Sequence, residues 1–182
     1  MVGMTSDSGG SIAAVEIVTQ SYMITGRCRG LTEEMRLIDL LSNSQVTHLQ
    51  LDSVKVRELL DCREVIATDG PLVIDKDSVV FARSLESPQA EEKRRETHRV
   101  DIVKRAAYLM LVFAPPFRIL GNVYLVKDAD FSVALPRLFD HFLAMTESKA
   151  VCEGETGLAW DSEFIVVNGR RIEMVCVSPP PA

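Results

Sequence analysis

The sequence is poor in the residues that carry catalysis or bind metal ions in small proteins. Its three histidines, His48, His98 and His141, share no metal-ligand spacing with each other or with a cysteine. Its four cysteines are too far apart to form a CxxC motif, so we expect reduced thiols and no disulfide. Residues 152–157 contain two glycines, but the acidic side chains among them would repel a phosphate and no GK[ST] follows. The sequence therefore predicts no catalytic residue, no metal and no cofactor.

Long hydrophobic runs are also missing. The longest, residues 106–119, is broken by Pro115, Pro116 and Arg118, and it falls short of the roughly 18 apolar residues that a membrane span needs. Residues 1–11 are rich in glycine and serine and have neither the basic start nor the apolar core of a secretory signal. We therefore expect a flexible tail at residues 1–13, a cytoplasmic protein and no membrane partner.

The chain has no excess of positive charge. Its net charge is −6 with a pI near 5.1, whereas nucleic-acid binding depends on neutralising phosphates. Positive charge gathers only in a segment at residues 86–108, where acid–base spacing predicts a charged helical linker with a solvated face. Nucleic-acid binding by this segment is an alternative hypothesis. The residues that would make the contact are Lys93, Arg94, Arg95, Arg99, Lys104 and Arg105.

What the sequence does contain is a pattern that occurs twice. Short apolar motifs return in the same order, and the spacing between copies changes only in stretches typical of loops, which favours an internal repeat. The first copy holds Tyr22-Met-Ile-Thr-Gly26, Leu37-Ile-Asp-Leu-Leu41 and Val73-Ile-Asp75, and the second holds Phe117-Arg-Ile-Leu-Gly121, Leu135-Pro-Arg-Leu-Phe139 and Val166-Val-Asn168.

Each copy is predicted to be rich in strands with one short helix. Asn168-Gly169 stands between β-branched runs, a pattern typical of a two-residue hairpin turn, and Asp75-Lys76 is its weaker first-copy version. Cys28 and Cys176 lie in alternating segments and are expected in the core. The expected strands are residues 14–18, 22–28, 46–56, 108–113 and the hairpin 164–177, and the expected helices are residues 35–42 and 134–142.

These motifs resemble a small uncharacterised β-rich domain family of bacteria, present here in tandem. They are also loosely similar in element content to Sm-like and SH3-like small barrels, which assemble into rings or bind nucleic acids or peptides. The resemblance carries over no catalytic or binding residue. The predicted fold is mainly β, with two pseudo-symmetric small barrels or bent sheets at residues 14–85 and 109–179, joined by the linker at residues 86–108.

The expected function is a non-catalytic binding or assembly module. Open strand edges of small sheets invite pairing with another chain, so a protein partner or self-association is expected. Trp160, the only tryptophan, is expected in the second core or in an interface. A second alternative is an enzyme with a site between the copies that uses Glu153, Asp161 or His141.

Overall fold

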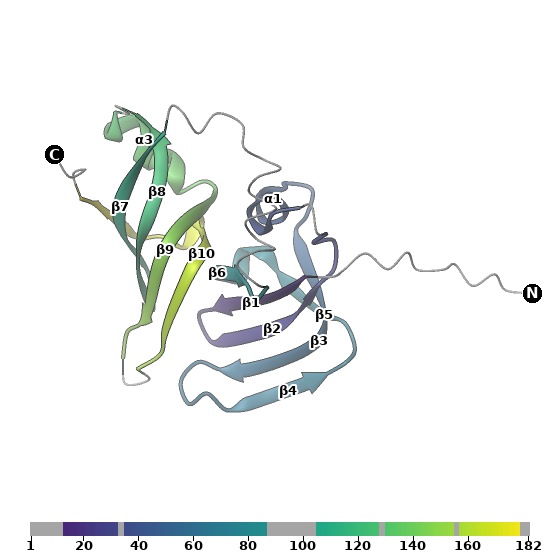
Figure 1. The fold of residues 1–182 in the computed structure, drawn as a ribbon. Helices are drawn as coiled ribbons and strands as arrows, with labels where there is room; N and C mark the ends of the chain where they lie inside the picture. The colour runs from purple at the N-terminus through teal and green to yellow at the C-terminus, as the bar shows by residue number, and fades with distance from the viewer. Residues whose placement is uncertain (1–12, 33–34, 87–104, 128–129, 155–156, 179–182) are drawn as a thin grey trace, which may run out of the picture.

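The computed structural model describes residues 13–32, 35–86, 105–127, 130–154 and 157–178 (Figure 1). We call residues 13–86 the first half and residues 105–178 the second half. The first half contains β1 (Ala14–Thr19), β2 (Tyr22–Cys28), α1 (Leu37–Ser42), β3 (His48–Glu58), β4 (Glu64–Thr68), β5 (Leu72–Asp75), η1 (Lys76–Ser78) and β6 (Val79–Ser84). The second contains β7 (Arg105–Ala114), β8 (Phe117–Val126), α3 (Phe131–Leu138), β9 (Phe142–Cys152), β10 (Ala159–Asn168), η3 (Gly169–Arg171) and β11 (Met174–Val177).

The strands form one antiparallel sheet in the order β11-β7-β8-β9-β10-β6-β1-β2-β3-β4, with β5 beside β3. The mainly β prediction is confirmed. The prediction of two separate barrels or sheets is wrong, because this order has two ends and β10 pairs with β6 across the halves. Alternating apolar residues predict strands, but they do not determine which strand edges meet.

A close approach of backbones explains the glycine in each repeated strand motif. A Cβ at Gly26 would lie 3.1 Å from the carbonyl oxygen of Asp52, and a Cβ at Gly121 would lie 3.1 Å from that of Thr146. The ladder register shifts at both glycines, because β3 has one extra residue opposite Gly26 and β9 has one opposite Gly121, which marks a β-bulge in β3 and another in β9. The chain turns from β1 into β2 at residues 19–22, where the Thr19 hydroxyl accepts a hydrogen bond from the Tyr22 N–H at 3.0 Å.

The helix predicted at residues 35–42 is confirmed as α1, whose leucines Leu37, Leu40 and Leu41 are buried. The helix predicted at residues 134–142 begins earlier, because Asp130 caps it by accepting a hydrogen bond from the Ser132 N–H at 2.9 Å. Its last predicted residue, Phe142, is instead the first residue of β9.

The hairpin predicted at Asn168-Gly169 is wrong. Asn168 has a φ of −74°, and its side chain caps η3 by accepting from the Arg170 N–H at 3.1 Å. The chain then leaves β10, and β11 pairs with β7 instead. Gly169 is needed here because a Cβ would overlap the carbonyl oxygens of Leu138 and His141. Asp75 caps η1 in the same way, so β5 and β6 do not form a hairpin either.

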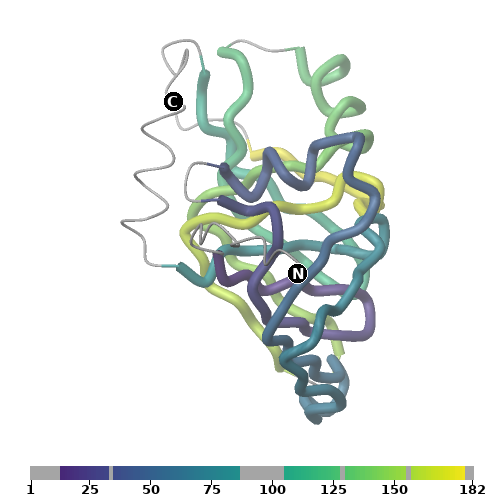
Figure 2. The backbone as a smooth tube through the Cα atoms, turned by 90° about the vertical axis from the view of Figure 1, so that its right-hand side faces the viewer, coloured from purple at the N-terminus to yellow at the C-terminus, as the bar shows by residue number. Residues whose placement is uncertain are grey.

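The core divides into two clusters that share β1 and β6. Val18 and Phe81 belong to the cluster shared with the second half, whereas Ile17 and Ala82 belong to the cluster of the first half. Successive residues of a strand point to opposite faces, so β1 and β6 lie between the two clusters. Figure 2 shows the first half in front of the second, with the turn between β3 and β4 at the lower end.

Candidate functional site

An open groove with a volume of about 680 Å³ lies on the first half. It lies beside β2, β4 and β5 and reaches the turn between β1 and β2. We call it the groove. Its apolar lining comes from Tyr22, Ile24, Val56, Val65, Ile66, Leu72, Val73 and Ile74, and its polar lining from Thr19, Gln20, Ser21, Glu58, Asp75, Ser78 and Arg171.

The groove opens where β3 has two different neighbours. β4 pairs with residues 54–57 of β3, and β5 pairs with residues 48–51. Between these two stretches Ser53 has a φ of +49°, a left-handed conformation that interrupts the regular strand. In the second half the single strand β10 covers both corresponding stretches of β9. The divided edge of the first half therefore provides a concave surface.

The matching surface of the second half is filled from within the chain. Phe81 of β6 inserts beside Phe117 and Trp160, with ring centroids 5.2 Å and 5.4 Å away in edge-to-face arrangements. By strand register, Tyr22 and Ile66 hold the positions of Phe117 and Trp160. In the first half, Val56 of β3 lies between Ile24 of β2 and Ile66 of β4. In the second half, Ala150 of β9 lies between Ile119 of β8 and Trp160 of β10. Tyr22 and Ile66 are each 43% exposed, whereas Phe117 and Trp160 are buried.

Three charged residues, Glu58, Asp75 and Arg171, line the groove, and among the described residues they do not belong to a group of three or more metal-ligand side chains. Arg171 donates from Nε to the carbonyl oxygen of Asp77 at 2.7 Å, which ties η3 to η1. Arg170 lies 3.5 Å from an Asp77 carboxylate oxygen.

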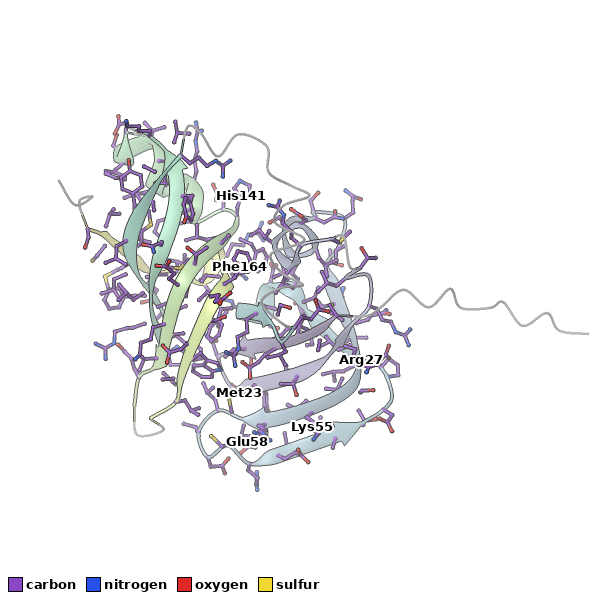
Figure 3. All side chains as sticks on the ribbon, in the orientation of Figure 1. Met23, Arg27, Lys55, Glu58, His141 and Phe164 are labelled. Atoms are coloured by element: carbon purple, nitrogen blue, oxygen red, sulfur yellow. The ribbon has the colours of Figure 1, made fainter. Side chains whose placement is uncertain are left out.

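A separate hollow of about 100 Å³ is lined by Glu16, Met23, Thr25, Lys55 and Arg57, and Figure 3 shows Met23 and Lys55 in the lower part of the first half.

The basic residues predicted to contact nucleic acid can be placed only in part. Lys93, Arg94, Arg95, Arg99 and Lys104 lie outside the described residues. Arg105 is the exposed first residue of β7, which begins three residues before the strand predicted from residue 108. Trp160 contacts Phe81 and Phe117 where the two halves meet.

The structure does not bring together the residues of the enzyme hypothesis. Glu153 forms an ion pair with Arg118 at 2.8 Å, and Asp161 lies 3.9 Å from Lys149. His141, labelled in Figure 3, lies immediately before β9. Its carbonyl oxygen accepts a hydrogen bond from the Gly169 N–H. Glu153, Asp161 and His141 do not line the groove. Over the described ranges, no group of three or more His, Cys, Asp or Glu residues could hold a metal ion.

All four cysteines are free, and they differ in exposure. Cys28 and Cys152 are buried, whereas Cys62 and Cys176 are exposed, so the prediction that Cys176 is a core residue is wrong. Cys176 alternates with apolar neighbours, but β11 is an edge strand and its side chains are only partly covered. Burial raises the pKa of the Cys28 thiol to about 11.

We predict that Cys28 reacts at least about 100-fold more slowly than Cys62 with a thiol reagent at pH 8, because the thiolate is the nucleophile. A raised pKa leaves less thiolate below pH 11, so labelling of Cys28 should accelerate as the pH rises toward 11. Peptide mapping by mass spectrometry measures both rates. Cys62→Ser should remove one rapidly labelled site, and equal rates at Cys28 and Cys62 would contradict the prediction.

The groove was not foreseen from the sequence. Tyr22, Ile66 and Val73 have the pattern of ordinary strand residues, and only their pairing register identifies them as exposed counterparts of buried side chains. Comparison of the chain with protein-family models, curated proteins and solved structures finds no match. No helix in the described ranges is long and apolar enough to cross a membrane.

Proposed function

We propose that this protein is a non-catalytic binding or assembly module that takes an extended segment of a protein into the groove and onto the edge of β5. The observation that carries the proposal is that the groove adjoins a strand edge with no pairing partner among the described residues. Val73 and Ile74 belong to β5 and also line the groove. An added strand would gain main-chain hydrogen bonds from the edge and side-chain burial from the groove, which is the usual mode of β-augmentation.

We propose further that the two halves are copies of one ancestral unit within the single sheet. Corresponding strands keep the same register in both halves, and the bulges opposite Gly26 and Gly121 occupy the same position. Ser53 of β3 and Glu147 of β9 lie at the same distance before Glu58 and Cys152, the last residues of the two comparable ladders, and share a φ of +49°. Independent origins would not require these local distortions to coincide.

Selection of displayed peptides against the protein tests the binding function. We expect enrichment of extended peptides with alternating apolar residues, and Ile66→Asp should weaken their binding about tenfold or more because it places a charge in the apolar groove. Val126→Asp is the matched control, since Val126 is 62% exposed and lies outside the groove. The proposal fails if no peptide is enriched, or if Ile66→Asp and Val126→Asp bind the selected peptides equally well.

A further inference from the structure

The contact between the two halves is a strand-to-strand contact. Val166 and Val167 of β10 face Ala82 and Phe81 of β6 in an antiparallel pair. Phe81 reaches from this pair into the aromatic site formed by Phe117 and Trp160. The contact thus joins the edge of one strand, β10, to a different strand, β6, that carries the inserted side chain.

Each strand in this contact has a counterpart in the other half. β5 corresponds to β10, because Leu49 and Ile74 are paired as Leu143 and Val167 are. β11 corresponds to β6 in the same way. Its Met174 faces Phe113 of β7 just as Phe81 faces Val18 of β1. The internal contact uses β10 and β6, so one complementary pair of strands, β5 and β11, is left over.

Both leftover strands have unpaired edges among the described residues, since β5 pairs with β3 alone and β11 with β7 alone. Their side chains are exposed where the counterparts are buried. Val73 is 56% exposed and its counterpart Val166 is 0% exposed. Met174 is 55% exposed and its counterpart Phe81 is 0% exposed. The internal contact is made once in each chain, so it covers the edges of β10 and β6 and leaves the corresponding residues of β5 and β11 exposed.

We propose that the segment taken into the groove is β11 of a second copy of this chain. In the register of the internal contact, Val175 of one copy faces Val73 of the other, and Met174 faces Ile74. Met174 then enters the groove between Tyr22 and Ile66, where its flexible side chain suits an irregular apolar site. This inference rests on the proposed binding function and specifies its partner.

The charges at the two contacts are complementary in the same sense. In the internal contact, Arg170 of η3 lies 3.5 Å from Asp77 of η1. These two residues hold corresponding positions, because Arg170 follows the capping residue Asn168 by two residues and Asp77 follows the capping residue Asp75 by two residues. In the contact between copies, Asp77 of the copy that supplies β5 therefore lies opposite Arg170 of the copy that supplies β11. Opposite charges face each other again, which favours this pairing over a β5-to-β5 contact.

The two surfaces differ, so the contact is head to tail. Every copy offers one β5 edge and one β11 edge, and repetition of the contact produces a closed ring or an open chain. A single-sheet monomer would then be one segment of a longer continuous sheet.

Light scattering after size-exclusion chromatography tests the assembly, and we expect dimers or larger species in the wild type. Met174→Asp should weaken association about tenfold or more by placing a charge against the apolar groove. Val126→Asp is again the control and should leave the assembly unchanged. Unaltered Trp160 fluorescence would show that each variant is folded, because Trp160 is the only tryptophan and lies in the internal contact.

Cross-linking tests the register. In a Cys62→Ser, Cys176→Ser background, Val73→Cys combined with Val175→Cys should form an intermolecular disulfide, since facing strand residues lie within disulfide reach. Val126→Cys combined with Val175→Cys should not form one. A wild type that stays monomeric at every soluble concentration overturns this inference, as does equal cross-linking of the two pairs. If such a monomer still binds selected peptides through Ile66, the binding function stands and only the self-partner is excluded.

Discussion

Phe81→Ala is expected to lower the free energy of unfolding by about 3–5 kcal/mol, the usual loss when a buried phenylalanine is truncated in a core. Phe81 is fully buried, and its ring packs edge to face against Phe117 and Trp160. It also lies on β6, whose pairing with β10 joins the halves. Truncation therefore removes core packing and loosens the contact between the halves at the same time.

Urea denaturation followed by Trp160 fluorescence measures this loss, because the signal comes from the contact itself. Tyr124→Ala is the matched control, since Tyr124 is a 46% exposed aromatic residue of β8 and its removal should change stability by less than about 0.5 kcal/mol. Similar losses in the two variants would show that Phe81 does not hold the halves together.

Gly169→Ala is expected to destabilise the fold by about 3 kcal/mol, the upper part of the range for overpacking a well-packed site. The added methyl group would overlap the backbone carbonyl oxygens of Leu138 and His141. The Leu138 oxygen belongs to the last residue of α3 and the His141 oxygen to the residue before β9, and the Gly169 N–H donates to the His141 carbonyl oxygen at 2.9 Å. Relief of the overlap therefore requires the backbone of two elements to move.

Gly70→Ala provides the control for the methyl group itself. A Cβ at Gly70 would lie 3.3 Å from the Thr68 hydroxyl oxygen, a side-chain atom that can rotate away. We expect this variant to change the unfolding free energy by less than about 1 kcal/mol. Thermal unfolding of both variants by circular dichroism compares them, and a Gly169→Ala protein as stable as Gly70→Ala would refute the proposed close contact.

Local periodicity predicted those elements that depend mainly on their own residues. The strand expected at residues 22–28 is β2 with the same bounds, and the helix expected at residues 35–42 contains α1. Both are defined by apolar residues at the spacing of a strand or a helix, and both bury the predicted side chains, such as Cys28 and Leu41.

Features that depend on distant partners could not be predicted in this way. The Asn168-Gly169 dipeptide has the composition of a hairpin turn, but packing against the α3–β9 connection and the side-chain cap of Asn168 select a 3-10 turn instead. The joining of the halves depends on a match between the edges of β10 and β6, which no local pattern encodes. The groove follows from the break between β4 and β5, so it was missed for the same reason.

The pairing of β6 with β10 has a consequence during synthesis of the chain. β6 leaves the ribosome long before β10, because 86 residues separate Phe81 from its partner Val167. At roughly 5–20 residues per second, β6 and Phe81 wait on the order of ten seconds for that partner. Throughout this interval the nascent first half presents an unpaired apolar edge, so we expect its early folding to depend on shielding from other nascent chains, by chaperones or by the ribosome surface.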